Sequence, residues 1–356
     1  MSSSGPVLAL VGATGQVGTA ALRVLSLRED GWGEVRLLDQ APSRRRMNVR
    51  GEPSPVRPLT EKAFDGVDVA VFDLPADLTA EWAPVAVGRG SVVVDNSGAF
   101  RGEPDVPVVA PEVNPDAVRD RPRGVVATPA SATMAMLDAL SALHTKWGLT
   151  ELVVTCYEAA SLEGERGVDR LHDELEVVVG ERTLGTVAGD VRRAVAEKLG
   201  EGSSPFPAPL ALNVVPWAGR QAVGGWSTRE LGIRSEVRRV LDAPELKVSA
   251  TCLVGPVVAT HSLAVHATFA GQVDVGEARQ VLLQAPTVVV IDDPAHGDFP
   301  TPVDVAGVEP AFVGRLRQAL DFPDTLEMFV CADNLQQGAA RGCVRIAELV
   351  AADLAG

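Results

Sequence analysis

The sequence has few cysteines and no long apolar run. Only 4 of its 356 residues are Cys, and no two of them form a CxxC pair. This scatter excludes a zinc knuckle and argues against a disulfide framework, so a reducing, cytoplasmic environment is expected. No stretch of about 18 uninterrupted apolar residues is present, so no membrane span is expected. Glycines interrupt the apolar start of the chain, which also lacks a basic beginning, and this argues against a secretory signal.

Positive charge is also scarce. Asp and Glu number 47 against 32 Lys and Arg, which gives a formal net charge of −15. Such a surface repels phosphate backbones and anionic headgroups, so we expect no nucleic-acid binding and no membrane docking. Hydrophobic residues make up 46% and charged residues 22%, which is ordinary globular usage and rules out wholesale disorder. At about 100–200 residues per domain, the length predicts two domains.

The first third of the chain alternates short apolar runs with helical or loop segments. The first run, at residues 7–11, is followed by a glycine turn and then by a helical pattern. This alternation predicts a doubly wound, parallel α/β sheet. Further strand-like runs are predicted at 35–38, 69–72, 92–94 and 125–126.

The pattern changes after Pro129. Longer alternating strands with helices between them predict an antiparallel sheet with helices on one face, which is a domain of the α+β kind. We therefore predict a dinucleotide-binding domain over 1–130, completed by a C-terminal helix within 332–356, and a substrate and dimerisation domain over 131–331. The predicted strands are 152–157, 248–258 and 261–269, and the predicted helices are 131–146, 169–179, 190–199 and 335–354.

The glycine turn is the candidate dinucleotide site. Its spacing is G-x-x-G-x-x-G, directly after a strand and before a helix. Glycine lets the backbone approach a pyrophosphate, and the N-terminus of the helix supplies free N–H groups and a positive dipole end. A tight structural turn is the alternative interpretation. The cofactor-binding candidates here are Gly12, Thr14, Gly15, Gln16, Val17 and Gly18.

Two signals about the cofactor conflict. Asp39 lies about 20 residues beyond the glycine turn, where an acid accepts the ribose hydroxyls of NAD and repels a 2′-phosphate. Arg44, followed by Arg45 and Arg46, would instead clamp the 2′-phosphate of NADP, unless these arginines form a solvated loop. NADP and NAD therefore both stay open as the cofactor.

Ordered blocks along nearly the whole chain resemble the aspartate-semialdehyde dehydrogenase family. They include GATGQVG at 12–18, DNSGAFR at 95–101, PVVAPEVNP at 107–115, YEAAS at 157–161 and ADNLQQGAA at 332–340. The resemblance implies a Rossmann domain, a second domain like that of glyceraldehyde-3-phosphate dehydrogenase, and a homodimer built through the second domain. Members of the family serve amino-acid biosynthesis: they reduce an aspartyl phosphate with NADPH through a cysteine thioester. The resemblance also implies that Asn96 and Arg101 bind the substrate and that Asn334 contacts the cofactor.

The nucleophile of the family is replaced in this chain. The family motif N-P-N-C-[ST]-T reads TPASAT at 128–133, which places Ser131 at the cysteine position. A thiol is already partly thiolate at neutral pH, whereas a hydroxyl needs a well-placed base. A serine could form only an ester, which resists hydride attack more than a thioester does. We therefore expect the standard phosphorylating reduction to be lost or altered.

Other positions depart from the family pattern as well. The resemblance implies that His261, in THSLAV, is the general acid and base. Glu158 stands where the family has a substrate-orienting glutamine, and Val254 where it has a substrate-binding arginine. The family's E-x-x-K pair aligns with Arg229 and Gly232. A charged hydrogen bond contributes about 1.5–3 kcal/mol, so these losses weaken binding of a dianionic substrate by several orders of magnitude.

The closest likeness at these positions is to the Usg-type paralogues, which also carry serine for cysteine and lack the arginine. One hypothesis is a divergent NAD(P)-dependent oxidoreductase acting on another small carbonyl or acyl substrate. The second is a non-catalytic paralogue that binds nucleotide or a partner subunit. The third is a hydrolase-like trio of Ser131, His261 and Glu158, which the family fold would bring near one another, although no G-x-S-x-G elbow is present. Cys156 as a replacement thiol is a further alternative, and no metal site is expected.

Overall fold

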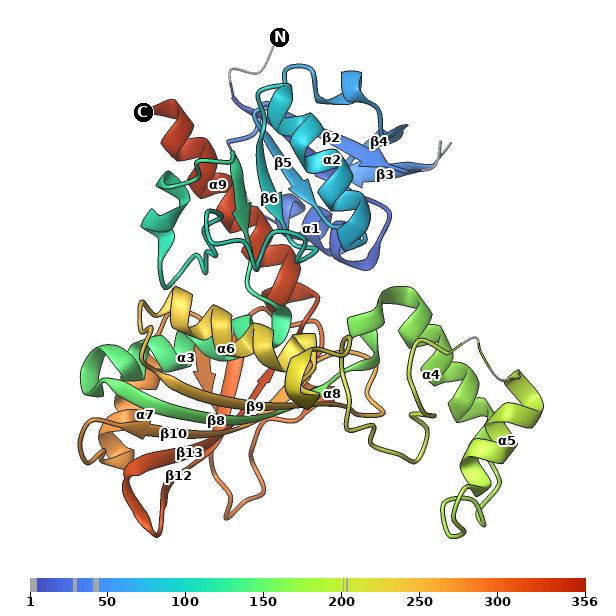
Figure 1. Cartoon of the computed structure of the whole chain (residues 1–356), viewed down its shortest axis with the longest axis vertical. Helices are drawn as coiled ribbons and strands as arrows, with labels where there is room; N and C mark the ends of the chain where they lie inside the picture. The colour runs from blue at the N-terminus through green and yellow to red at the C-terminus, as the bar shows by residue number, and fades with distance from the viewer. Residues whose placement is uncertain (1–4, 28–30, 41–44, 201, 203) are drawn as a thin grey trace. The chain divides into compact units, whose positions relative to one another are not determined.

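A computed structural model describes residues 5–27, 31–40, 45–200, 202 and 204–356, and these form two compact units (Figure 1). The first unit contains the described residues of Met1–Leu137, Ser235–Pro244 and Leu335–Gly356. The second contains those of Asp138–Arg234 and Glu245–Asn334. No helix in the described ranges has the length and apolar character needed to cross a membrane.

The first unit is built on a seven-stranded sheet with the order β3-β4-β2-β1-β5-β6-β7. All neighbouring strands are parallel except β3 and β4, which form an antiparallel hairpin. The strand order runs outward from β1 in both directions, so a switch point lies between β1 and β5. The predicted parallel α/β sheet is confirmed. The five predicted runs form β1 (Val7–Val11), β2 (Glu34–Asp39), β5 (Val69–Phe72), β6 (Val92–Asp95) and β7 (Val125–Ala127).

Helices and short turns complete the first unit. The last predicted helix is divided in two, because a π-helical turn, η5 (Gln336–Arg341), precedes α9 (Gly342–Ala355). The helix α3 (Ser131–Trp147) begins in this unit, and the second half of α6 (Thr228–Val240) also belongs to it. The other elements are α1 (Gln16–Ser26), α2 (Ala76–Gly88), η1 (Glu61–Phe64), η2 (Pro115–Arg119) and the hairpin strands β3 (Arg46–Val49) and β4 (Glu52–Pro58).

The second unit is built on a six-stranded sheet with the order β11-β12-β13-β10-β8-β9. The predicted antiparallel sheet is wrong for two pairs, β8 with β9 and β11 with β12, which are parallel. A long crossover that includes α4 (Gly164–Val178) and α5 (Asp190–Leu199) separates β8 from β9 and permits the parallel pairing. The strands are β8 (Leu149–Glu158), β9 (Lys247–Val254), β10 (His261–Phe269), β11 (Val288–Val290), β12 (Ala311–Ala319) and β13 (Phe322–Ala332).

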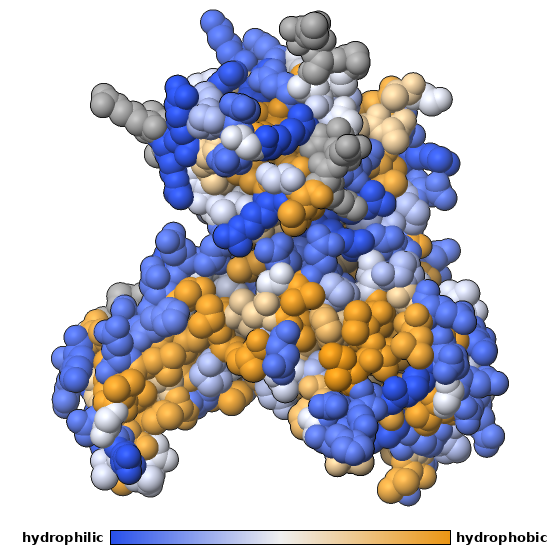
Figure 2. Space-filling model, turned by 180° about the vertical axis from the view of Figure 1, so that it is seen from behind, coloured by the Kyte–Doolittle hydropathy of each residue, from blue (hydrophilic) through white to orange (hydrophobic). Residues whose placement is uncertain are grey.

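One face of this second sheet is buried and the other is exposed. Along β8, Leu152, Val154 and Cys156 are buried, whereas Val153 and Tyr157 are 50% and 38% exposed. Figure 2 shows that apolar side chains gather on the surface of the second unit in that view. Its remaining elements are α7 (Val275–Gln284), α8 (Pro302–Val305), η3 (Ala160–Glu163) and η4 (Val223–Gly225).

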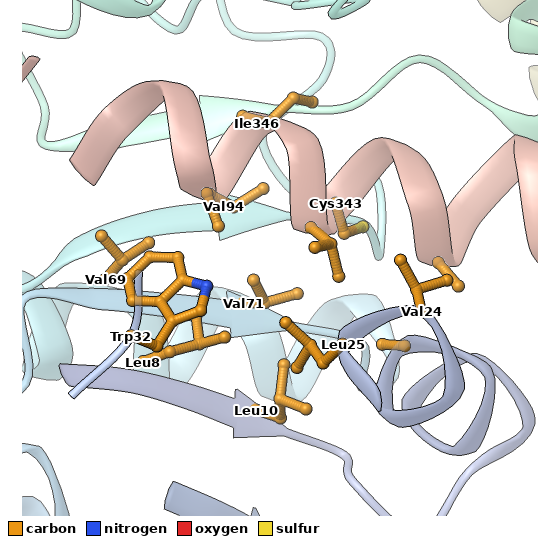
Figure 3. Close-up of a cluster of buried hydrophobic side chains, with 14 of the residues drawn as sticks. Leu8, Leu10, Val24, Leu25, Trp32, Val69, Val71, Val94, Cys343 and Ile346 are labelled. Carbon is orange, nitrogen blue, oxygen red and sulfur yellow. The ribbon is translucent and has the colours of Figure 1, made fainter. Parts of the chain in front are cut away.

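The core of the first unit lies between the parallel sheet and the helices α1 and α9. Val71 and Val94 of the sheet belong to one buried cluster with Cys343 and Ile346 of α9 (Figure 3). These four side chains are at most 4% exposed. Burial of this apolar surface stabilises the C-terminal helix on the sheet that begins the chain.

Candidate active site

The glycine turn between β1 and α1 has the shape that a dinucleotide phosphate needs. Gly12 has a φ of +89°, and a Cβ there would lie 2.2 Å from the carbonyl oxygen of Asp73. A Cβ at Gly18 would lie 2.5 Å from the carbonyl oxygen of Gly12, so packing requires both glycines. A Cβ at Gly15 would meet nothing closer than 3.4 Å. A side chain at Gly15 would thus make only ordinary van der Waals contacts with the protein, and glycine there leaves the exposed backbone open to a phosphate.

Two neighbours of Gly15 complete this turn. The side-chain oxygen Oε1 of Gln16 is buried with no hydrogen-bond partner, which leaves an acceptor for a bound molecule. Val17 is partly buried against the core of the first unit. The residues of the turn thus fit a dinucleotide, and the N-terminus of α1 would face its phosphates.

Asp39, at the end of β2, is bonded to the glycine turn. The backbone N–H and the hydroxyl of Thr14 both donate to its Oδ2, at 3.2 and 2.5 Å. The N–H of Gln40 donates to Oδ1 at 2.8 Å. The carboxylate thus orients the turn through bonds that the sequence did not reveal. The predicted role of Arg44 lies outside the described residues, while the exposed Arg46 lines a groove beside α1.

Ser131 is the first residue of α3 and lies against the π-helical turn. A Cβ at Gly338 would lie 2.8 Å from the Cβ of Ser131, so the two segments meet only because residue 338 is glycine. The N–H of Ala130, just before the helix, donates to Oε2 of the buried Glu236 at 2.8 Å. The serine hydroxyl is thereby placed at the positive end of a 17-residue helix.

The predicted substrate residues Asn96 and Arg101 belong to one hydrogen-bond network in the first unit. Arg101 donates from Nε to the carbonyl oxygen of Thr128 at 2.6 Å and from Nη2 to that of Asn96 at 3.3 Å. The amide of Asn96 donates to Asp73 at 2.7 Å and accepts from the Thr128 hydroxyl at 2.9 Å. Burial raises the pKa of Asp73. The network fixes the loops after β5, β6 and β7 relative to one another.

His261 is fully buried in the second unit, and its ring orientation is set by a backbone donor. The N–H of Ala159 donates to Nδ1 at 3.1 Å. A neutral imidazole carries one ring proton, so that proton lies on Nε2. Nε2 is 3.8 Å from Oε2 of Glu158. Burial lowers the pKa of His261 to about 4, so at neutral pH the ring is an uncharged hydrogen-bond donor.

Glu158 is a fully buried carboxylate at the end of β8. Nη1 of Arg229, from α6, lies 3.3 Å from its Oε2. Its register partner on β9 is Val254, the position of the family arginine. The positive charge beside Glu158 therefore comes from a helix rather than from the neighbouring strand. The sequence carried a signal for this pairing, since residues 158 and 229 both depart from the family pattern, but their proximity depends on the fold.

Asn334 has partners within the second unit. Its Nδ2 donates to the hydroxyl of Ser161 at 3.0 Å, and its Oδ1 accepts from the N–H of Thr260 at 2.9 Å. These bonds tie the loops before β10 and after β8 to the end of β13. The cofactor contact implied for Asn334 stays a prediction.

All four thiols are buried. Cys156 lies opposite Cys252, its register partner on β9, and both are 0% exposed. Desolvation raises the pKa of Cys331 to about 11 and also raises that of Cys343. The native thiols therefore lack the exposure of a nucleophilic cysteine. Within the described part of the chain, no group of three or more His, Cys, Asp or Glu residues could hold a metal ion.

A parallel sheet with a glycine turn at its switch point, joined to a mixed-sheet unit with a buried histidine, defines a dehydrogenase-like protein that binds a nicotinamide dinucleotide. Residues 7–121 match the family described as "Semialdehyde dehydrogenase, NAD binding domain", and residues 140–337 match "Semialdehyde dehydrogenase, dimerisation domain". The chain belongs to the aspartate-semialdehyde dehydrogenase family. The predicted Rossmann domain, the second domain like that of glyceraldehyde-3-phosphate dehydrogenase, and NAD(P) as the cofactor class are confirmed.

Similar proteins cover the chain almost end to end. It is 38% identical over 349 residues to an aspartate-semialdehyde dehydrogenase of Streptomyces akiyoshiensis, covering 98% of this chain and 99% of the relative. Identity to the enzyme of Aquifex aeolicus is 35% over 346 residues, or 96% and 97% of the two chains. The structure of aspartate semialdehyde dehydrogenase II from Vibrio cholerae complexed with ASA superposes with a TM-score of 0.89 at 30% identity, covering 99% of each chain.

Proposed function

We propose that this protein is an NAD(P)-dependent oxidoreductase that reduces or forms a small carbonyl compound without a thioester intermediate. One observation carries the proposal: a hydroxyl stands at the nucleophile position, Ser131, and all four native thiols are buried. A covalent acyl-enzyme suited to hydride attack then has no sulfur to form on. Phosphorylating reduction of aspartyl phosphate would then be lost or very weak.

The reaction that remains is direct hydride transfer. A nicotinamide dinucleotide held at the glycine turn would supply a hydride for the carbonyl carbon, or accept one from an alcohol in reverse. In reduction the π bond of the carbonyl breaks, its electron pair moves to oxygen, and oxygen takes a proton from solvent. The Nε2–H of His261 donates a hydrogen bond to that oxygen while its charge develops. A neutral donor suits this role, because His261 gives a hydrogen bond and keeps its own proton.

The hydrolase-like alternative has less support from the histidine geometry. A serine–histidine pair needs a ring nitrogen free to accept the serine proton. In this chain Nδ1 already accepts the N–H of Ala159, and Nε2 carries the proton. The acid also lies on the wrong side, since Glu158 is near Nε2 rather than Nδ1. His261 is thus arranged as a donor and not as a base for Ser131.

The experiment follows the dinucleotide absorbance at 340 nm under two conditions. In the first, NADPH or NADH is mixed with small aldehydes and no phosphate; in the second, NADP is mixed with aspartate semialdehyde and phosphate. We expect turnover only in the first, insensitive to iodoacetamide and retained within a few-fold by Ser131→Ala. Phosphate-dependent turnover that iodoacetamide abolishes would overturn the proposal. Dinucleotide binding without turnover of any aldehyde would favour the non-catalytic paralogue.

We also propose a homodimer formed through the second unit. The matched family description calls residues 140–337 a dimerisation domain. The exposed face of its sheet carries apolar Val153 and Phe329 together with the charged Arg317 and Glu327 around a shallow hollow. A mixed apolar and charged sheet face is what a self-complementary interface requires.

A further inference from the structure

The most unusual group in the second unit is the carboxylate of Glu158. It is 0% exposed, and neither Oε1 nor Oε2 accepts a hydrogen bond. Nη1 of Arg229 forms an ion pair with Oε2 at 3.3 Å, without hydrogen-bond geometry. A buried acceptor that makes no hydrogen bond destabilises the fold, and an ionised acceptor does so more strongly. Such a group is retained where a bound molecule supplies the missing donor.

The charged groups around Glu158 decide which kind of molecule its carboxylate can accept a hydrogen bond from. His261 is neutral near pH 7, since burial lowers its pKa to about 4. Glu163 adds a second carboxyl, whose pKa is raised by burial and by the negative charge of Glu158. Arg229 is the cation in contact, and Asp333 acts on His261 from the end of β13. Arg166 acts on Glu163 as a second cation, so two arginines face the three carboxyls of Glu158, Glu163 and Asp333, and the local balance favours a donor or a cation over an anion.

The neighbouring strand shows what the site does not bind. Val254 is directly opposite Glu158 in the β8–β9 register, is 1% exposed, and offers only an apolar side chain. A carboxylate or phosphate placed there would meet the negative charge of Glu158 with no new cation to offset it. An ammonium, hydroxyl or amide N–H would instead satisfy the open carboxylate oxygens.

We propose that Glu158 is a specificity-determining residue that selects carbonyl substrates bearing a hydrogen-bond donor, above all an amine, and rejects those bearing a second anion. This inference rests on the proposed carbonyl oxidoreductase function and names its substrate class. Arg229 is the positioning residue that holds the carboxylate in place, and Val254 keeps the opposite wall apolar.

The test uses three aldehydes of three carbons that differ only at the far end: 3-aminopropanal, propanal and 3-oxopropanoate. Their reduction by NADPH or NADH is followed at 340 nm with the full-length protein. We expect kcat/KM to fall in that order, with 3-aminopropanal at least about tenfold above propanal, as one charged hydrogen bond allows. Glu158→Gln should remove this preference, and the control Glu151→Gln, an exposed residue of the same strand, should keep it.

A second, gain-of-function variant keeps the proposal testable if the Glu158→Gln protein fails to fold. Val254→Arg places a cation beside Glu158 and should raise kcat/KM for 3-oxopropanoate while lowering that for 3-aminopropanal. Calorimetric titration with 3-amino-1-propanol and 1-propanol, without dinucleotide, reports binding independently of turnover.

The outcomes separate the inference from the function on which it rests. Turnover of all three aldehydes at equal kcat/KM in the native protein overturns the role of Glu158 and leaves the oxidoreductase function standing. Binding of 3-amino-1-propanol that Glu158→Gln abolishes, with no aldehyde reduced, supports the role of Glu158 and overturns the oxidoreductase function. Neither turnover nor binding overturns both.

Discussion

At the scale of single residues, His261 shows how a backbone contact decides chemistry. Its Nδ1 accepts the N–H of Ala159, and the ring is 0% exposed. Protonation would place a second ring proton on Nδ1, where it would point at the N–H of Ala159. Burial of the ring also disfavours its charged form. The sequence identified the residue through the THSLAV motif, but the tautomer depends on the end of β8, which is distant in the chain.

The depressed pKa of His261 predicts a pH dependence of stability. The unfolded histidine binds a proton near pH 6.5 and the folded one near pH 4, so between these values the unfolded state holds more protons. The free energy of unfolding should therefore rise with pH across this window, by about 3 kcal/mol from this group. Urea unfolding at pH 4.5 and 7 measures it. His261→Asn should flatten the rise, whereas the exposed-site control His296→Asn should not.

The position of Ser131 predicts the reactivity of a thiol placed there. Ser131→Cys would lie at the N-terminus of α3, where the helix dipole lowers a thiol pKa. Iodoacetamide should modify this cysteine at least about tenfold faster than any of the four buried native ones, as read by intact mass. The control Ser141→Cys, inside the same helix, should react more slowly. Equal rates for both variants would show that position 131 has no activating environment.

At the scale of elements, the sequence predicted β1, β2, β5, β6 and β7 of the first unit and β8, β9 and β10 of the second, but it missed β11 and the long strand β13. The parallel strands of the first unit read as apolar runs, because both of their faces are covered. The hairpin β3–β4 was missed, since its residues are largely exposed and β4 contains three prolines. The long strand β12 was missed because bulges after Gly314 and after Gln318 break its alternation. Parallel pairing of β8 with β9 joins segments far apart, which local patterns do not encode.

The close contact between the π-helical turn and α3 predicts that one methyl group added at Gly338 lowers the stability of the fold. Gly338→Ala would place a Cβ 2.8 Å from that of Ser131, so the segments must separate. We expect a loss of about 1–3 kcal/mol in the free energy of unfolding, measured by urea denaturation. Gly102→Ala, where a Cβ meets no atom within 4 Å, is the matched control. A loss equal to that of the control would contradict the close packing.

At the scale of the whole molecule, the family resemblance found the fold and the positions of the site, and the structure supplied their contacts. Ser131, Glu158 and Val254 were identified by comparison with a motif. Arg229 was identified in the same way as a departure from the family pattern, but its pairing with Glu158 was not, and Glu236 was not identified, because both contacts join distant parts of the chain. The exposed face of the sheet in the second unit is likewise a property of the folded strands, since Val153 alternates with buried neighbours along β8.

The proposed dimer predicts that a charge placed on the exposed sheet face of the second unit lowers the mass of the protein particle in solution. Val153 is 50% exposed on the open face of the sheet. Val153→Arg should convert the native dimer to a monomer, because a buried unpaired charge at the interface costs several kcal/mol. Light scattering coupled to size exclusion measures the mass. Leu354→Arg, on the 50% exposed Leu354 of α9, should leave the dimer intact, and a native protein that elutes as a monomer would refute the proposal.

The central claim is that hydride passes directly to a carbonyl with no sulfur in the path. Deuterium-labelled NADPH or NADH, mixed with the native protein and 3-aminopropanal, tests this most directly. We expect an alcohol with a single deuterium on carbon, formed without phosphate and at the same rate after iodoacetamide treatment. A covalent acyl adduct on the protein in the reverse direction, released by phosphate as an acyl phosphate, would contradict it.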